Sequence, residues 1–478
     1  MLGGILLLLT ACSLVPSPRR SAEPQPGPAT FPAPVGPVES SGPGIGSPGL
    51  GDPYFARYGN GGYDVASYDL AVRFTPSTGE LSGVATITGA AKFELKRFNL
   101  DLHGLTVSKV TVGGAPASFR RDSDELIVTP PVAVKGGSGF TTIVEYAGKP
   151  GGLGASNLGE AGFKAANGVT FVAGEPESAT SWFPVNDHPS DKATYTIAIS
   201  VPDGQDVISN GVLAGKQADG GWTTWRWTVT SPMASYLATF AVGDLRVEEA
   251  THRGKQVRIA VAETIPAESV ASVDETTEIC DFFEQYFGPY PFDAYGAIVI
   301  DDPNLGFSLE TQTRPVYAVS MVRDGDPRGV VAHELAHQWF GDSVSIAKWR
   351  DIWLNEGFAT YAQWLWTDHD GGPTMEQQFD RYYTNAVSPI WTVPPGDPTA
   401  ARLFHQSVYS RGAMTLYALR KKVGDDTFYK ILKTWTAERK DRNATTDDFV
   451  ALAQQVSGQD LESLFADWLF ATKRPPHP

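Results

Sequence analysis

The sequence predicts a multidomain protein in which a β-rich part is followed by a mainly α-helical part. Its 478 residues are enough for two or three domains. Short runs that alternate apolar and polar residues fill positions 54–244, whereas helical spacing of apolar residues prevails after position 265. This change of period from 2 to 3.6 residues indicates two domains of different class.

Residues 1–12 are typical of a signal peptide that ends at a lipidation site. Positions 2–9 form an apolar run too short to span a bilayer, and Thr10-Ala11-Cys12 follow it as in a bacterial lipobox. No Lys or Arg precedes the run, so a simple secretory signal with an incidental cysteine is the alternative. We expect lipidation at Cys12 and an extracytoplasmic protein of the bacterial cell membrane, lipid-anchored or secreted.

The next segment, 13–52, is rich in Pro, Gly, Ser and Ala, and we expect a disordered tether. No other apolar stretch approaches the roughly 20 residues that a bilayer span needs. The second cysteine, Cys280, loses its only possible partner if Cys12 is processed, so we expect no disulfide bond.

Residues 53–248 are expected to form an antiparallel β saddle or sandwich. The runs 68–74 and 194–199 alternate in polarity, and the pairs Asp203-Gly204 and Asn210-Gly211 are typical of tight turns. Residues 249–478 are expected to be mainly helical with one small sheet. The predicted elements of this part are a strand at 295–300 and helices at 275–287, 328–341, 415–423, 446–456 and 461–470.

The formal charge is −16, from 54 acidic and 38 basic side chains. Because no run of Lys and Arg reverses this charge locally, a nucleic acid is excluded as a partner. Acidity of this kind usually serves solubility, although it also attracts cationic peptides.

The segment 333–337 reads His-Glu-Leu-Ala-His, a pattern that can bind a metal ion. On a helix His333 and His337 lie on one face, so both imidazoles can reach the same ion, and Glu334 projects beside it as a general base. Glu356 follows after eighteen residues in a second helical stretch and can supply a third ligand. Two imidazoles and one carboxylate favour a single zinc ion with its fourth position open to water.

A histidine ligand usually donates its other ring N–H to an acceptor. Asp342 and Asn355 are the nearby candidates for this role, and the sequence does not assign either to a particular histidine.

Residues 333–342 read His-Glu-Leu-Ala-His-Gln-Trp-Phe-Gly-Asp, and 353–361 read Trp-Leu-Asn-Glu-Gly-Phe-Ala-Thr-Tyr. Both segments resemble the gluzincin zinc aminopeptidases, the family of aminopeptidase N. The resemblance covers residues 60–472 and implies a thermolysin-like α+β catalytic domain after the β-domain. It also predicts a short form that lacks the C-terminal helical repeat domain of many relatives, and therefore a more open site that admits longer peptides.

The resemblance also implies residues that recognise a peptide with a free N-terminus. The family's Gly-x-Met-Glu-Asn motif aligns with residues 307–311, where Glu310 matches the glutamate that binds the substrate's amine. Phe307 stands in place of the glycine, which alters the backbone setting of this anchor. A second acidic anchor is expected at Glu175, with Glu177 as the fallback.

Residues 408–413, Val-Tyr-Ser-Arg-Gly-Ala, resemble the family's Val-x-Tyr-x-Lys-Gly-Ala, so Tyr409 is expected to stabilise the oxyanion of the intermediate. The sequence thus predicts a zinc metallo-aminopeptidase whose partners are peptides and whose membrane contact is limited to the lipid anchor. Two alternatives are a zinc endopeptidase of the same fold and a non-catalytic surface binding protein. The oligomeric state is not indicated.

Overall fold

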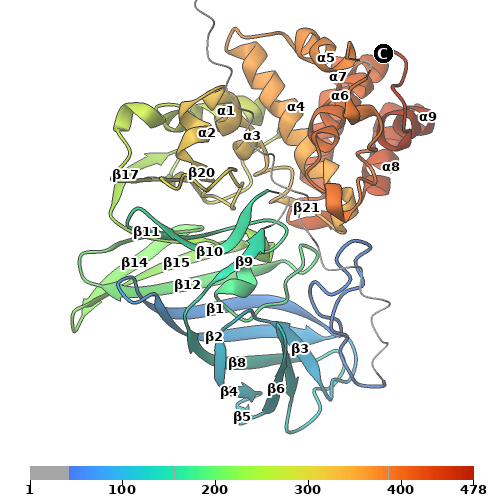
Figure 1. Ribbon diagram of the computed structural model, residues 1–478. Helices are drawn as coiled ribbons and strands as arrows, with labels where there is room; N and C mark the ends of the chain where they lie inside the picture. Colours follow the sequence, from blue (N-terminus) through green and yellow to red (C-terminus); the bar gives the residue numbers. More distant parts are fainter. Residues whose placement is uncertain (1–41, 156–157, 386) are drawn as a thin grey trace, which may run out of the picture.

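The computed structural model describes residues 42–155, 158–385 and 387–478, and shows a β-domain beneath a mainly helical domain (Figure 1). The predicted order of domains is confirmed. The signal peptide with Cys12 and residues 13–41 of the predicted tether lie outside the described residues. In the described ranges no helix is both long and apolar enough to cross a membrane.

The largest sheet of the β-domain has eight strands in the order β14-β15-β12-β1-β2-β8-β4-β5. Its strands are β1 (Tyr63–Thr75), β2 (Glu80–Ala91), β4 (Thr106–Val112), β5 (Ala115–Pro116), β8 (Gly139–Gly148), β12 (Ala193–Pro202), β14 (Val212–Asp219) and β15 (Trp222–Met233). Along β1 the apolar residues Leu70, Val72 and Phe74 are buried and the residues between them are exposed, as the alternation predicts. All pairs in this sheet are antiparallel except β1 with β12, so the sheet is mixed rather than purely antiparallel.

Two smaller sheets complete this domain. One has the order β13-β16-β11-β10-β9 and the other β3-β7-β6. Their strands are β3 (Phe98–Asp101), β6 (Ser118–Asp122), β7 (Glu125–Thr129), β9 (Gly152–Ala155), β10 (Glu160–Ala166), β11 (Val169–Ala173), β13 (Asp206–Ser209) and β16 (Phe240–Gly243). The five-stranded sheet lies next to the helical domain, and the loop that follows β11 carries Glu175.

The second domain begins with a four-stranded sheet, β17-β18-β19-β20, and also holds the parallel pair β21-β22. Its strands are β17 (Leu245–His252), β18 (Lys255–Ala262), β19 (Ala294–Ile300), β20 (Val316–Ala318), β21 (Val344–Ile346) and β22 (Arg442–Ala444). The predicted domain boundary at 248/249 is wrong by a few residues. It cuts β17, which pairs with β18 over its whole length, so the change of domain lies near Asp244.

Helices build the rest of the second domain. They are α1 (Thr276–Phe287), α2 (Val319–Arg323), α3 (Pro327–Ala336), α4 (Trp353–His369), α5 (Met375–Tyr383), α6 (Gly412–Val423), α7 (Asp425–Glu438), α8 (Thr446–Ser457) and α9 (Glu462–Phe465). Helix α3 begins where the Asp326 side chain accepts a hydrogen bond from the backbone N–H of Gly329, with Pro327 at the first helical position. The predicted helix 328–341 ends early, at Ala336, where the backbone N–H groups of Gln338 and Trp339 donate to the carbonyls three residues back instead of four.

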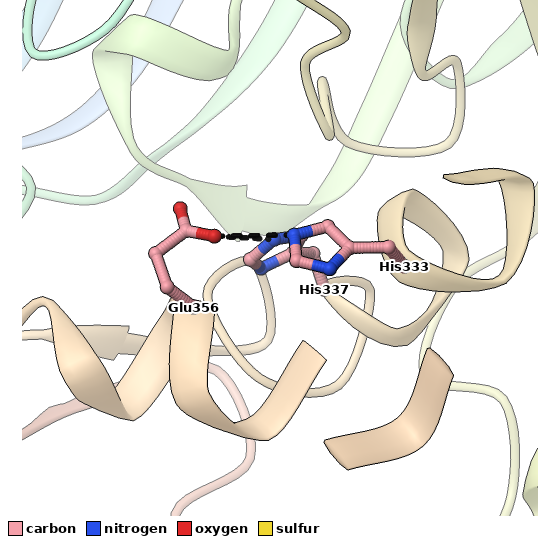
Figure 2. A group of neighbouring side chains, drawn as sticks. All are labelled: His333, His337 and Glu356. Atoms are coloured by element: carbon pink, nitrogen blue, oxygen red, sulfur yellow. Dashed lines mark hydrogen bonds and ion pairs between the residues drawn. The ribbon is translucent and has the colours of Figure 1, made fainter. Parts of the chain in front are cut away.

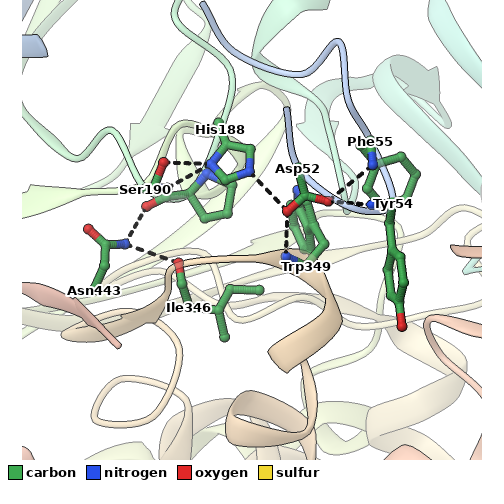
Figure 3. Close-up of polar contacts among 9 residues, drawn as sticks. Asp52, Tyr54, Phe55, His188, Ser190, Ile346, Trp349 and Asn443 are labelled. Carbon is green, nitrogen blue, oxygen red and sulfur yellow. Dashed lines mark hydrogen bonds and ion pairs between the residues drawn. The ribbon is translucent and has the colours of Figure 1, made fainter. Parts of the chain in front are cut away.

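The last residues of the predicted tether are part of the folded body. Asp52 is buried, and its carboxylate accepts hydrogen bonds from the backbone N–H groups of Tyr54 (2.8 Å), Phe55 (3.1 Å) and Trp349 (2.9 Å) (Figure 3). Nε2 of His188 lies 3.4 Å from the same carboxylate. Eleven residues of the predicted tether, 42–52, are therefore part of the folded body: the backbones of Gly44 and Gly46 are hydrogen-bonded to those of Lys96 and Arg97, and Asp52 ties the end of the segment to both domains.

Nearby, the Asn443 side chain donates to the carbonyls of Pro189 (2.7 Å) and Ile346 (3.1 Å), which adds a second link between the domains. Figure 3 shows both links side by side at the domain boundary.

Replacing Asp52 with Ala should lower the free energy of unfolding by about 1–3 kcal/mol, because buried N–H donors on both sides lose their acceptor. Burial alone would raise the pKa of Asp52, but the hydrogen bonds from His188 and three backbone N–H groups hold it below its usual value. A lowered pKa stabilises the fold above the unfolded-state value near 3.8, so the difference from the unmodified protein should shrink as the pH falls below that value.

Chemical denaturation at several pH values measures this effect. Asp69→Ala, at an exposed position of β1, is the matched control and should leave stability unchanged. Equal stability of the Asp52→Ala variant and the control at neutral pH would contradict the link.

Candidate active site

A pocket of about 280 Å³ lies at the junction of the two domains and contains every site residue that the sequence predicts within the described ranges. These residues are Glu175, Glu310, His333, Glu334, His337, Glu356 and Tyr409. They come from six segments: the loop after β11, the loop before β20, helix α3, its C-terminal end, helix α4 and the turn before α6. The neighbouring carboxylate of Glu177 does not line the pocket and instead accepts a hydrogen bond from the hydroxyl of Tyr58 at 2.9 Å.

Two imidazoles converge on one carboxylate. Nε2 of His333 lies 3.1 Å and Nε2 of His337 lies 3.5 Å from Oε2 of Glu356 (Figure 2). Ligands at about 2.0–2.1 Å around a tetrahedral ion are about 3.3–3.4 Å apart, so these separations suit one zinc ion held by the three residues. The chemistry of the donors agrees, since neutral imidazoles and a carboxylate are preferred zinc ligands.

The pKa values of Glu356 and His337 are shifted in opposite directions by their mutual attraction. Burial opposes the ionised form of Glu356, but the charge of His337 and the hydrogen bonds of both imidazoles hold the pKa of Glu356 at about 2. For His337 burial alone would lower the pKa, and the carboxylates of Glu356 and Glu310 raise it well above its usual value. Glu356 is therefore an ionised ligand, and the site favours the binding of a cation.

The outer nitrogen of His337 has a partner that was not predicted. Its Nδ1 lies 3.0 Å from the backbone carbonyl oxygen of Phe340, so neither Asp342 nor Asn355 fills this role. The cause is the early end of α3, after which the chain turns and brings the carbonyl oxygen of Phe340 within hydrogen-bond distance of Nδ1. Asp342 instead accepts a hydrogen bond from the side-chain amide of Gln338 at 2.8 Å.

Four carboxylates meet in the pocket. Burial raises the pKa of Glu334 well above its usual value, and it also raises the pKa of Glu310. The pKa of Glu175 is raised well above normal by burial and then by the charge of Glu310. Oε1 of Glu175 is buried and has no hydrogen-bond partner in the described part of the chain. A cationic group between Glu175 and Glu310 would satisfy this oxygen and relieve their repulsion.

Tyr409 reaches the metal site from a π-helical turn, Ser407–Arg411. Its ring stacks near that of His333, with centroids 6.0 Å apart. Burial, together with the charge of Glu356, raises the pKa of Tyr409 well above its usual value, so its hydroxyl remains a proton donor. Helices α4 and α6 approach closely at Gly357 and Gly412, where an added Cβ would lie under 3.0 Å from the facing backbone. This close approach brings the tyrosine next to the zinc ligands.

Two further residues of the site were not predicted. The hydroxyl of Tyr236, from the β-domain, donates to Oε1 of Glu310 at 2.9 Å. The side chain of Gln338 donates to the backbone carbonyl of Glu310 at 3.0 Å. Gln338 directly follows His337 in the segment 333–342, so the sequence places it beside the zinc ligands. No local pattern in the sequence marks Tyr236.

Known proteins with similar chains are peptidases. The solved structure of an M1 zinc metallopeptidase from Deinococcus radiodurans is 31% identical, with a TM-score of 0.83, and the match covers 90% of this chain and 98% of that one. A mutant form of that protein bound to a Tyr-Ser-Ala substrate matches equally well, at 30% identity and a TM-score of 0.83 over 90% and 99% of the two chains.

Two similar curated proteins are aminopeptidases. The human glutamyl aminopeptidase is 30% identical over 62% of this chain and 33% of its own length. The leucyl aminopeptidase of Saccharolobus solfataricus is 28% identical over 85% of this chain and 53% of its own length. The chain thus matches a third to about half the length of these relatives.

Removing a ligand should release the metal. His333→Ala and Glu356→Gln are expected to bind far less than one zinc per chain after dialysis, because each leaves only two protein ligands. Glu334→Gln is the matched control and should keep one zinc, since Glu334 is not part of the trio at 3.1–3.5 Å. Elemental analysis measures the content. Full zinc occupancy in the Glu356→Gln variant would contradict the assigned ligands.

Models of two successive domains of one family match the chain. The peptidase M1 N-terminal domain matches residues 65–237, and the peptidase family M1 domain matches residues 271–468. These ranges coincide with the β-domain and with the helical domain that holds the zinc ligands. Together with the solved structures that align over nine tenths of its length, they show that the chain belongs to peptidase family M1.

Proposed function

We propose that this protein is a zinc metallo-aminopeptidase that removes the N-terminal residue from peptides. The observation that carries the proposal is the pair of carboxylates, Glu175 and Glu310, in the same pocket as the zinc ligands, where a carboxylate oxygen of Glu310 lies within 4.8 Å of a ring nitrogen of His337. An ammonium group held by that pair places the first peptide bond of a substrate beside the metal ligands. The names of the curated relatives and the tripeptide substrate bound to the similar structure support the same activity.

The residues of the chain divide the chemistry between them. A zinc ion held by His333, His337 and Glu356 would polarise the scissile carbonyl and make a bound water acidic. Glu334 accepts the proton of that water and passes it to the leaving amine. Tyr409 donates a hydrogen bond to the oxygen of the carbonyl as negative charge develops there. Glu310 and Glu175 orient the peptide through its free amine.

A zinc endopeptidase would use the same metal and base but would not need the two carboxylates of Glu175 and Glu310 beside them. Acetylation of the substrate's amine distinguishes the two activities because it removes the charge that the carboxylates bind. A non-catalytic binding protein is disfavoured, since Glu334, Tyr409 and the three metal ligands all face one pocket.

The test compares a short peptide with its N-acetylated form. The unmodified protein should release the first residue of the free peptide and should cleave the acetylated peptide at least 100-fold more slowly, about the effect of an unpaired buried charge. Glu334→Gln, which keeps its zinc, should lose cleavage of the free peptide by a similar factor or more. Mass spectrometry of the products gives both rates. Undiminished cleavage of the acetylated peptide would establish an endopeptidase instead.

We further propose that the protein is anchored by a lipid at Cys12 on the outer side of a bacterial cell membrane. The supporting observations are the apolar run at 2–9, the small residues before Cys12 and the Pro- and Gly-rich segment that follows. In a bacterial host the unmodified chain should incorporate labelled palmitate and sediment with membranes, whereas Cys12→Ala should do neither. Equal labelling of the two forms would contradict this proposal.

A further inference from the structure

The amine anchor Glu310 lies in a tight loop that the rest of the molecule holds from several sides. The loop begins and ends at a bridge in which the backbone N–H groups of Leu309 and Val316 each donate to the other residue's carbonyl, both at 2.8 Å. Within it Thr313 has a φ of +66°, a left-handed conformation that is unfavourable for a β-branched residue. Such a conformation persists only where surrounding contacts enforce it.

The helical domain holds the main chain of this loop through one side chain. Gln338 accepts a hydrogen bond from the N–H of Thr313 at 2.8 Å and donates to the carbonyl of Glu310 at 3.0 Å. Because Gln338 follows His337 directly, the position of the anchor's backbone is tied to that of the zinc ligand.

The β-domain holds the same loop from the opposite side. The Asn210 side chain donates to the carbonyl of Gln312 at 2.8 Å, and the N–H of Gly211 donates to the hydroxyl of Thr313 at 2.7 Å. These contacts come from the turn between β13 and β14. They fix the backbone of the loop but leave the carboxylate of Glu310 free to rotate about its side-chain bonds.

One side chain of the β-domain removes that freedom. The hydroxyl of Tyr236 donates to Oε1 of Glu310 at 2.9 Å, and in the described ranges it is the only side chain that donates a hydrogen bond to this carboxylate. Tyr236 itself is rigidly placed. It is 1% exposed, its ring lies 5.7 Å from that of Trp349, and its carbonyl accepts a hydrogen bond from the hydroxyl of Ser178 at 3.0 Å.

We propose that Tyr236 is a positioning residue that orients the Glu310 carboxylate across the domain boundary, so that its second oxygen faces the substrate's amine. The proposal rests on the aminopeptidase function proposed above. A carboxylate that is held at one oxygen loses less freedom when the other oxygen binds an ammonium group, and its negative charge keeps one fixed direction. The β-domain is thereby a working part of the site through Tyr236 as well as through Glu175.

The experiment compares two zinc-binding ligands that differ only in the amine. These are leucine hydroxamate and 4-methylpentanohydroxamate, the same molecule without its amino group. Calorimetry gives the affinity of each for the zinc-loaded protein. Tyr236→Phe should weaken binding of leucine hydroxamate by about 10- to 100-fold, the effect of losing a hydrogen bond to a charged group, and leave the amine-free ligand unchanged. For peptides KM should rise more than kcat falls.

Two controls separate positioning from a general loss of structure. Tyr63→Phe removes a buried tyrosine hydrogen bond of the same kind, to the carbonyl of Asn99 at 2.6 Å, and should change neither affinity. In a Glu310→Gln background Tyr236→Phe should have almost no further effect, because both changes act on one interaction.

The outcomes are distinct. Equal weakening of both hydroxamates by Tyr236→Phe, or no weakening of either, would overturn the role of Tyr236. If the amine adds no affinity even in the unmodified protein, the amine anchor and with it the aminopeptidase function are wrong.

Discussion

The arrangement of the site depends on the free-energy cost of burying several carboxylates in one pocket. Glu175, Glu310, Glu334 and Glu356 are each at most 7% exposed, and no lysine or arginine is among the described residues that line their pocket. Such a cluster is unstable unless positive charge is supplied. A zinc ion held by the two histidines and Glu356, together with the ammonium group of a substrate under the proposed function, would supply that charge, so one electrostatic demand would favour both metal binding and a free N-terminus.

These carboxylates keep their relative positions only if the two domains keep a fixed orientation. Glu175 and Tyr236 come from the β-domain, whereas Glu310 and the zinc ligands come from the helical domain. The domain boundary is accordingly rich in buried polar links: Asp52 joins the N-terminal segment to Trp349, Asn443 joins Pro189 to Ile346, and Lys192 donates to the carbonyls of Asp342 and Ser343 at 2.7 and 2.8 Å. Directional bonds of this kind fix an orientation that apolar packing alone leaves adjustable.

The parts of the site that were predictable from the sequence are those set by local geometry. His333 and Glu334 lie in α3 and His337 caps its C-terminal end in helical conformation, so a spacing of four residues determines the common direction of the two imidazoles. Glu310, Glu175 and Tyr409 could be named only through the resemblance to a family, since nothing local brings them to the zinc.

Tyr236 and the acceptor of His337 were predicted neither from local geometry nor from the resemblance. Each depends on where distant chain segments pack, and the early end of α3 could not be read from residues whose spacing remains helical to Gly341. The end of the tether was missed because Asp52, an ordinary polar residue in a Pro- and Gly-rich stretch, acquires its role only from tertiary contacts.

The π-helical turn at Ser407–Arg411 makes the tyrosine of this site sensitive to the length of the chain. A π-turn contains one residue more than an α-helical turn, and each residue rotates a helix by about 100°. Deleting a single residue there would let α6 continue as a regular helix and would turn the phenol of Tyr409 away from the zinc ligands, even with every side chain of the site still encoded. The number of residues in this turn, and not only their identity, is therefore a constraint on the site.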